Sequence, residues 1–247
     1  MTLDRRILIG LAVAFTVAGI FAYLNFWHPT VTLRYRLTLE AMTPDGPKTG
    51  SGVIQVSYGS TFNLDGGGRR GVMKVTGEAV PVDLGRGNVL FVTLTNYISG
   101  RNHSFGKLDG AANAETLPLV VFGFKWNVGD EYQLPPQIAA AQASGPREVP
   151  FRSLPTLVKF EDVNNPKSVG LVQPERLSAA FGEGYALSKV TMEIKNDPPS
   201  EGIAKLLNWL PKLIENRLRL NGEKGPVTDN ALSNNLGAGE FKRNDQF

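Results

Sequence analysis

The chain has 247 residues, a formal net charge of +3 at pH 7, 27 glycines, 16 prolines and no cysteine. This composition excludes collagen-like, disulfide-stapled and wholly disordered proteins. The absence of thiols also excludes thiolate metal sites, cysteine nucleophiles and thiol redox chemistry. We expect a membrane anchor over residues 1–28, one β-rich domain over 29–220 and a flexible tail over 221–247, where glycine, asparagine and charged residues dominate.

The N-terminal segment has the pattern of a transmembrane helix. Arg5 and Arg6 precede an uncharged run of 21 residues, from Ile7 to Trp27. At about 1.5 Å per residue a helix over this run is about 31 Å long, close to the roughly 30 Å of a hydrocarbon core. Tyr23 and Trp27 fall where aromatic side chains meet the far interface. The sequence therefore predicts a single-pass anchor held by Arg5, Arg6, Ile7, Tyr23 and Trp27.

The arginine pair indicates the orientation of this anchor. By the positive-inside rule it stays in the cytoplasm, so the bulk of the chain is expected outside. Arg34 and Arg36 weaken the charge asymmetry across the span. A cleaved signal peptide is the alternative, with 16–18 as its cleavage site, but the apolar run exceeds the about 7–15 residues of a signal core, which favours an uncleaved signal-anchor.

The strongest secondary-structure signal follows the anchor. Apolar residues occupy every odd position from Val31 to Ala41 and polar residues the even ones, which predicts a strand with one buried face. Turn residues follow at Thr43–Pro47, and a second strand carries Ile54, Val56 and Tyr58 on one face. We expect these two strands to form a hairpin with a long loop.

Further strands are predicted along the chain, and residues 85–88 indicate a second hairpin. Two of the apolar runs, 89–94 and 117–124, have no polar face, so we interpret them as central strands covered on both sides. The body is therefore predicted to be mainly β, an antiparallel β-sandwich-like domain. The predicted strands cover residues 72–75, 80–84, 89–95, 117–124, 158–160 and 190–194.

Two helices complete the predicted domain. A short one spans Pro174–Phe181, with proline at its start and Gly182 after its end. A C-terminal amphipathic helix begins at a Ser200 cap, and Pro211 either kinks it or divides it in two.

Around Trp209, Leu210 and Lys212 this helix combines leucines, an aromatic ring and basic residues. This combination would suit a membrane surface or a partner. Packing of the leucine face onto the sheet is the interpretation we favour.

Part of the sequence resembles a set of uncharacterised bacterial single-pass membrane-anchored envelope proteins. The resemblance is carried by 160–169, by Pro174, Leu177, Phe181–Gly182 and Gly184, by Leu187, Val190 and Glu193–Ile194, by Gly202–Ile203, Leu207 and Trp209–Leu210, and by the segment Tyr35–Tyr58. These residues are of structural types, and together the segments cover about half of the chain. The resemblance implies a bacterial envelope location and no catalytic residue. Together with the predicted anchor, we expect an inner-membrane protein whose bulk is periplasmic.

Residues with catalytic or metal-binding chemistry form no recognisable group. His28 and His103 are the only histidines and belong to no ligand motif. Segment 66–71, three glycines and two arginines before a fourth glycine, could cradle an anion but is more typical of a strand connection. Asp162, Asn164 and Asn165 lack the spacing of a calcium loop and indicate a turn. Glu175 and Glu183 are assigned to no cleft.

No cofactor is therefore predicted, and the small, dispersed basic excess argues against nucleic-acid binding. The sequence favours a membrane-anchored, non-catalytic binding or scaffolding protein of the bacterial envelope, with membrane lipid and an envelope protein as partners. The alternatives are an envelope enzyme acting on lipid, glycan or peptide, and an accessory subunit of a larger membrane complex.

Overall fold

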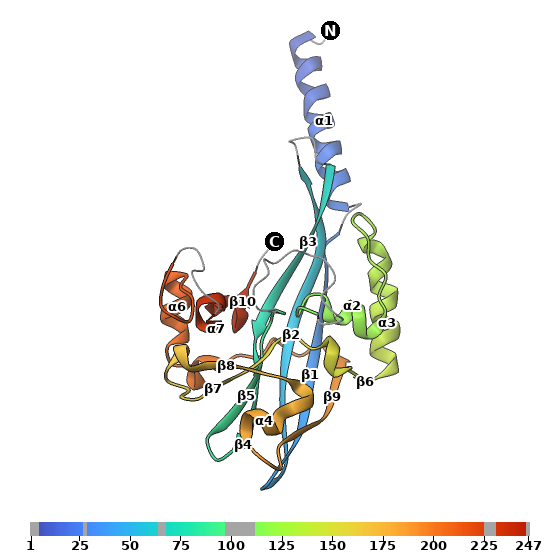
Figure 1. Ribbon diagram of the computed structural model, residues 1–247. Coiled ribbons are helices and arrows are strands. Elements are labelled where there is room, and N and C mark those ends of the chain that lie inside the picture. The colour runs from blue at the N-terminus through green and yellow to red at the C-terminus, as the bar shows by residue number, and fades with distance from the viewer. Residues whose placement is uncertain (1–4, 27–28, 64–67, 97–111, 225–230, 246–247) are drawn as a thin grey trace.

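The computed structural model describes residues 5–26, 29–63, 68–96, 112–224 and 231–245. The chain is mainly β, and its strands form two antiparallel sheets. Helix α1 (Arg5–Phe26) extends from one end of the body, and its described side chains are exposed. Figure 1 shows α1 continuing the long direction of the sheet away from the other elements.

The larger sheet has six strands in the order β10-β3-β2-β1-β9-β6. Its centre is the hairpin predicted from the alternating pattern, in which Tyr35 lies opposite Ile54 and Val31 opposite Tyr58. The predicted long loop is wrong, because only Pro44 and Asp45 separate the two strands. The strands are β1 (Val31–Thr43), β2 (Gly46–Asn63), β3 (Gly68–Glu78), β6 (Arg147–Glu148), β9 (Ala186–Ile194) and β10 (Lys242–Asn244).

The smaller sheet has four strands in the order β4-β5-β7-β8, and its first two strands form the second predicted hairpin. Strand β4 packs across β2, so the two sheets meet there. The strands are β4 (Val80–Gly85), β5 (Asn88–Val92), β7 (Leu157–Phe160) and β8 (Val169–Val172). The larger apolar cluster includes the buried face of β1 and β2 and the inner side chains of β4.

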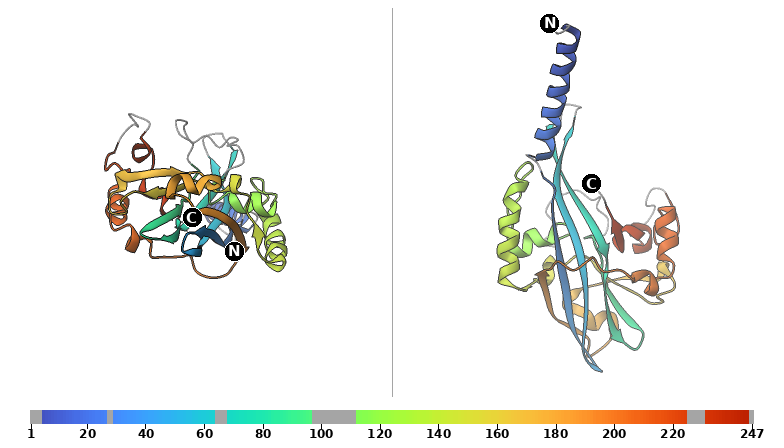
Figure 2. Two further views of the ribbon diagram at one scale, coloured as in Figure 1. Left: turned by 60° about the horizontal axis from the view of Figure 1, so that its bottom comes forward. Right: turned by 180° about the vertical axis from the view of Figure 1, so that it is seen from behind.

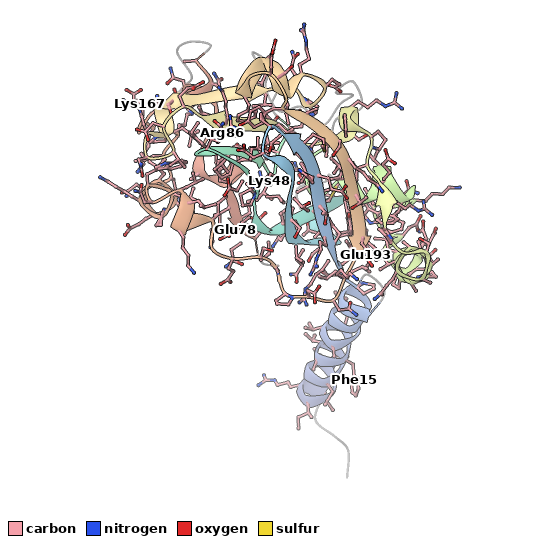
Figure 3. All side chains as sticks on the ribbon, turned by 90° about the horizontal axis from the view of Figure 1, so that it is seen from below. Phe15, Lys48, Glu78, Arg86, Lys167 and Glu193 are labelled. Carbon is pink, nitrogen blue, oxygen red and sulfur yellow. The ribbon has the colours of Figure 1, made fainter. Side chains whose placement is uncertain are left out.

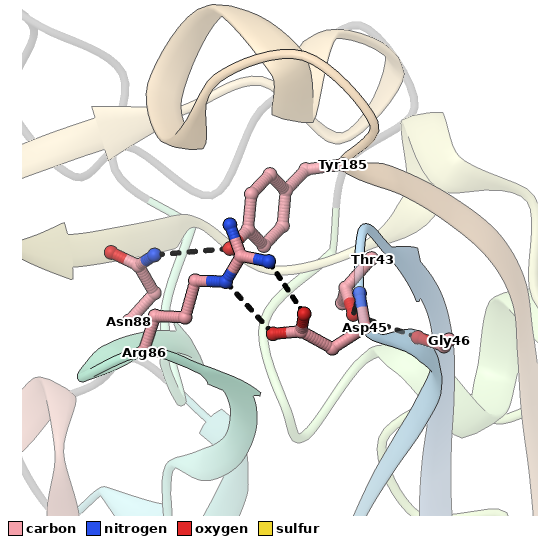
Figure 4. A network of polar contacts seen from close by, with 6 residues as sticks. All are labelled: Thr43, Asp45, Gly46, Arg86, Asn88 and Tyr185. Carbon is pink, nitrogen blue, oxygen red and sulfur yellow. Dashed lines mark hydrogen bonds and ion pairs between the residues drawn. The ribbon is translucent and has the colours of Figure 1, made fainter.

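A polar network joins the turns of the two hairpins (Figure 4). Arg86, which adopts a left-handed backbone conformation, donates from Nε and Nη2 to the two carboxylate oxygens of Asp45, at 2.9 and 2.5 Å. This pairing lowers the pKa of Asp45. Asn88 donates to the hydroxyl of Tyr185 beside it, at 3.3 Å. The network fixes the end of the body farthest from α1.

The predicted strand over 117–124 is wrong, since this segment contains helix α2 (Leu117–Phe122). Pro118 occupies the first turn, where a missing amide hydrogen costs nothing, and Gly123 ends the helix in a left-handed conformation. Helix α3 (Leu134–Ser144), for which we predicted no element, lies beside the larger sheet. Figure 2 shows α2 and α3 together on one side of the sheet and the C-terminal helices on the other.

The predicted C-terminal helix consists of two helices. They are α5 (Ile203–Leu206) and α6 (Leu210–Asn216), with Pro211 in the first turn of the second. The alternative in which proline ends one helix and opens another is thus confirmed. Ser200 is not the cap we expected, because its hydroxyl accepts the amide of Val53 instead. The predicted short helix is confirmed as a 3-10 turn leading into α4 (Leu177–Phe181).

The predicted flexible tail differs from the structure over residues 231–245. Helix α7 (Leu232–Asn235) is followed by β10, which pairs with β3. The buried carboxylate of Glu78 accepts from Lys242 Nζ at 2.7 Å and from the amide of Ile203 at 2.8 Å, so it ties β10 and α5 to β3. Figure 3 shows Glu78 within the body, far from Phe15 on α1. Apolar side chains of the last segment complete a second cluster.

Candidate functional site

Two buried tyrosines at the α1 end of the larger sheet hold a polar segment against its face. The hydroxyl of Tyr35 donates to the carbonyl of Ala114 at 2.9 Å, and the hydroxyl of Tyr58 donates to the carbonyl of Glu115 at 2.8 Å. Burial raises the pKa of both tyrosines, and the nearby Glu115 charge adds to that effect. Both hydroxyls therefore remain protonated and act as fixed hydrogen-bond donors.

Asn113 connects the polar side chains of this segment. Its Oδ1 accepts the amide of Asn96 at 2.7 Å, and its Nδ2 donates to Glu115 Oε1 at 3.4 Å. The segment is also fixed by the Ala114 amide, which donates to the carbonyl of Leu94. We call Thr95, Asn96, Asn113 and Glu115 the polar cluster. It is a candidate binding site because it brings buried donors and acceptors together beside an ordered strand end.

Three atoms of the polar cluster are buried without a hydrogen-bond partner in the part of the chain that the structure describes. They are Thr95 Oγ1, Asn96 Nδ2 and Glu115 Oε2. A buried polar atom left unpaired costs free energy, so such atoms call for an explanation. The amide nitrogen of Asn96 and the carboxyl oxygen of Glu115, two residues that Asn113 links, could bind a small polar group that both donates and accepts hydrogen bonds.

The electrostatic state of Glu115 follows from its burial. Desolvation raises the pKa of its carboxyl, against the lowering effects of a backbone hydrogen bond, Arg243 and Asn113. The neutral acid is therefore favoured over a wider pH range than in an exposed glutamate. A neutral Glu115 can donate as well as accept a hydrogen bond.

We expect Glu115→Gln to remove a pH dependence of stability. Below the ordinary pKa of 4.5 the carboxyl is protonated in both the folded and the unfolded chain. Above it the unfolded chain ionises first, so wild-type stability falls until the raised folded pKa is passed. The amide of the variant cannot ionise, so the variant should gain stability relative to wild type as the pH rises from acidic to neutral.

This expectation is checked by urea unfolding at a series of pH values. Glu175→Gln is the matched control, because it makes the same replacement at an exposed glutamate of the body. Identical pH dependence in wild type and Glu115→Gln would contradict the proposed burial of a titrating acid.

The residues predicted as an anchor lie along α1. Arg5, Arg6 and Ile7 form its first turn, Tyr23 belongs to its C-terminal part, and Trp27 lies outside the described residues. No helix in the described ranges meets the length and apolarity that a membrane span requires. The membrane crossing itself stays a prediction.

Trp209, Leu210 and Lys212 lie at the start of α6 and are not one surface patch. Leu210 is buried, and Trp209 packs against Phe160 and Phe241 while its Nε1 donates to the carbonyl of Val163 at 2.8 Å. Only Lys212 is exposed. The favoured interpretation, packing of the leucine face onto a sheet, is confirmed, because Leu207, Leu210 and Leu213 are buried in one cluster with Phe91 and Val158 of the smaller sheet.

The other polar candidates are not brought together. His28, His103, Gly66 and Gly67 lie outside the described residues, and Arg69 and Arg70 belong to β3. Asp162 and Asn165 make a turn, in which their side chains accept the amides of Asn164 and Lys167. Glu175 and Glu183 are exposed. Within the described ranges, no group of three histidine or acidic residues could hold a metal ion.

Sequence reasoning missed the polar cluster, because the run after Glu115 was interpreted as a strand. Pro118 offered the missing signal, since proline in a first turn after a polar residue is typical of a helix start. With a helix there, residues 113–116 become a helix entry that must be fixed to the core.

No family model, curated protein or solved structure significantly matches this chain.

Proposed function

We propose that this chain is a single-pass, membrane-anchored binding or scaffolding protein of the bacterial envelope, with α1 in the inner membrane and the β-rich body in the periplasm. The observation that carries the proposal is the exposure of α1. Large apolar side chains are exposed on all sides of the helix, and Phe15 reaches 75%. Those that the structure describes are Ile7, Ile9, Leu11, Val13, Phe15, Val17 and Ile20.

Exposure of this kind is costly in water and favourable in lipid. A helix that is apolar on every face needs apolar surroundings on every face, and the body buries none of the α1 side chains that the structure describes. The helix has 22 residues, so it is about 33 Å long, and it has no charged residue after Arg6. Insertion in a bilayer would remove all of these side chains from water.

Binding, as opposed to catalysis, is supported by the polar cluster. Within the described residues it contains buried donor and acceptor atoms without a hydrogen-bond partner, its backbone is fixed by hydrogen bonds to Leu94 and Asn96, and the tyrosine hydroxyls beneath it are held in their protonated form. Such an arrangement selects a ligand by hydrogen bonding and needs no group that transfers protons or electrons.

We expect the full-length chain to remain with membranes during alkaline extraction and to lose that retention in the double variant Val13→Arg, Phe15→Arg. Each arginine at the centre of a span costs about 2.5–3.5 kcal/mol of insertion free energy. The matched control is Val120→Arg with Leu171→Arg, which places two arginines at exposed apolar positions of the body and should leave retention unchanged.

The side of the membrane is tested with alkaline phosphatase fused to the C-terminus, which is active only when exported. Recovery of the wild-type chain in the soluble fraction would overturn the anchor. The periplasmic orientation would be overturned if the phosphatase fusion were inactive and a reporter that fluoresces only in the cytoplasm were fluorescent when fused at the same position.

A further inference from the structure

At the end of the body nearest α1, strands β2 and β3 extend past the start of β1. Val31, the first residue of β1, pairs with Tyr58, whereas Arg70 pairs with Thr61 three residues farther along β2. The pairing continues to Asn63 and Gly68, five residues past Tyr58, so the β2–β3 pair reaches about 17 Å beyond β1 on the side of α1. Figures 1 and 2 show this extension beside the base of α1.

The segment between α2 and α3 packs against the same extension. A Cβ on Gly71 would lie 2.8 Å from Val128 Cγ2 and 3.1 Å from the Trp126 ring, and Gly71 pairs with Ser60. The Trp126 ring also contacts Tyr58, with ring centroids 5.4 Å apart. Residues 125–132 are thus fixed beside the end of the β2–β3 pair.

Basic and apolar side chains share this end. Arg70 and Lys125 are exposed and Arg69 is half-buried, while Asp130 is a half-buried acid and Glu131 is buried. Val128 is 45% exposed and Tyr132 60% exposed. We call Arg69, Arg70, Lys125, Val128 and Tyr132 the α1-proximal surface; Arg69 lies on the Gly71 face of β3, and Arg70 lies on the opposite face of the same end. Its basic groups can pair with phosphates, and its tyrosine and valine suit the headgroup region of a bilayer.

The connection to α1 keeps this surface close to where α1 ends. Only residues 27–30 separate Phe26 from Val31, so the two residues are at most roughly 17 Å apart. If α1 lies in lipid, the α1-proximal surface cannot be far from the headgroups. The basic charge, the exposed apolar side chains and the short connection therefore all indicate that lipid headgroups contact this surface.

We infer that the α1-proximal surface rests on the anionic lipid headgroups of the membrane that holds α1, and so fixes the body at one orientation. This inference depends on the proposed anchoring by α1. The exposed apolar residue Met42 lies at the opposite end of β1, beside the hairpin turn, and should remain in water.

The test uses the full chain in vesicles of phosphatidylcholine with and without phosphatidylglycerol. Because the chain has no cysteine, single variants Tyr132→Cys, Val128→Cys, Met42→Cys and Phe15→Cys can each carry one environment-sensitive fluorophore. We expect lipid with a nitroxide at its headgroup to quench labels at 132 and 128 when phosphatidylglycerol is present, and not the label at 42. A nitroxide in the acyl chain should quench the label at 15.

A charge-reversal variant tests the electrostatic part. Arg69→Glu, Arg70→Glu and Lys125→Glu together should abolish quenching at 132 and leave quenching at 15 unchanged. The matched control reverses Lys167, Arg176 and Lys189, which are exposed outside the α1-proximal surface, and should retain quenching at 132.

The outcomes separate the two proposals. If the label at 15 is quenched while the labels at 132 and 128 are quenched no more than the label at 42, this inference is overturned and the anchor still holds. Quenching at 132 that is equal without phosphatidylglycerol would overturn the anionic lipid. Absence of quenching at 15 would overturn the proposed anchor itself.

Discussion

Replacement of Phe241 by alanine should destabilise the body by about 4 kcal/mol, the range for truncating a buried aromatic ring. The ring is fully buried and lies within 5.7–6.3 Å, centroid to centroid, of the rings of Phe91, Phe160 and Trp209. These partners come from β5, β7 and the start of α6, so the ring joins the smaller sheet to the C-terminal helices. Its loss would leave a cavity that no single neighbour can fill.

The backbone around Phe241 increases the expected effect. The Phe241 carbonyl accepts the amide of Ala79 at 2.8 Å, and the neighbouring Glu240 carbonyl accepts the amide of Leu94 at 2.8 Å. A shift of the backbone toward the cavity would disturb both bonds and the pairing of β10 with β3 that follows. The segment that we predicted to be a flexible tail would then keep only the buried Leu236 and Ala238 in the second cluster.

Thermal unfolding of the full chain in detergent measures the effect. For a body of about 200 residues a loss of 4 kcal/mol lowers Tm by roughly 8–16 °C. Phe15→Ala is the matched control, since Phe15 is exposed on α1 and contributes to no apolar cluster of the body. A Tm within a degree or two of wild type for Phe241→Ala would show that the last segment does not contribute to the core.

The parts of the fold that could be predicted are those in which local pattern and burial agree. In β1 and β9 one face is buried and the other contacts water, so the period of two is visible in the sequence. The turn at Asp162–Asn165 was predictable because its side chains bond to their own backbone.

Elements that depend on distant contacts were not predictable. Strand β10, Lys242–Asn244, has no apolar side chain and exists because β3 offers it an edge. The run 117–124 is short and apolar throughout, so periodicity cannot distinguish a buried strand from a buried helix. Helix α3 combines two prolines with four alanines and has a weak apolar face.

The candidate site has the same limitation. Asn96, Asn113 and Glu115 are ordinary polar residues in the sequence, and only the fold brings them together beside Tyr35 and Tyr58 and buries Asn96 and Glu115. The basic and apolar residues of the α1-proximal surface come from β3 and from the segment before α3. Their proximity depends on the packing of Val128 at Gly71, which no local pattern indicates.

Replacement of Gly50 by alanine should be nearly as damaging as the loss of Phe241, for the opposite reason. A Cβ on Gly50 would overlap the carbonyl oxygen of Pro81 and lie 2.9 Å from the Cα of Val82. Both obstacles are backbone atoms of β4, so no side-chain rotation can relieve the overlap. The smaller sheet would therefore have to move away from β2. The close contact continues along the strand, because a Cβ on Gly52 would lie 2.9 Å from Val80.

We expect Gly50→Ala to cost about 3 kcal/mol, the upper part of the range for overpacking, and to lower Tm by roughly 6–12 °C. Gly170→Ala is the matched control, because Gly170 also lies in a strand and a Cβ there would meet nothing closer than 3.8 Å. That control should be neutral or slightly stabilising, since alanine loses less backbone entropy than glycine on folding. Equal Tm values for the two variants would mean that β4 does not approach β2 as closely as the structure has it. The junction between the two sheets would then have to depend on the apolar side chains of β4 and on the Asp45–Arg86 pair.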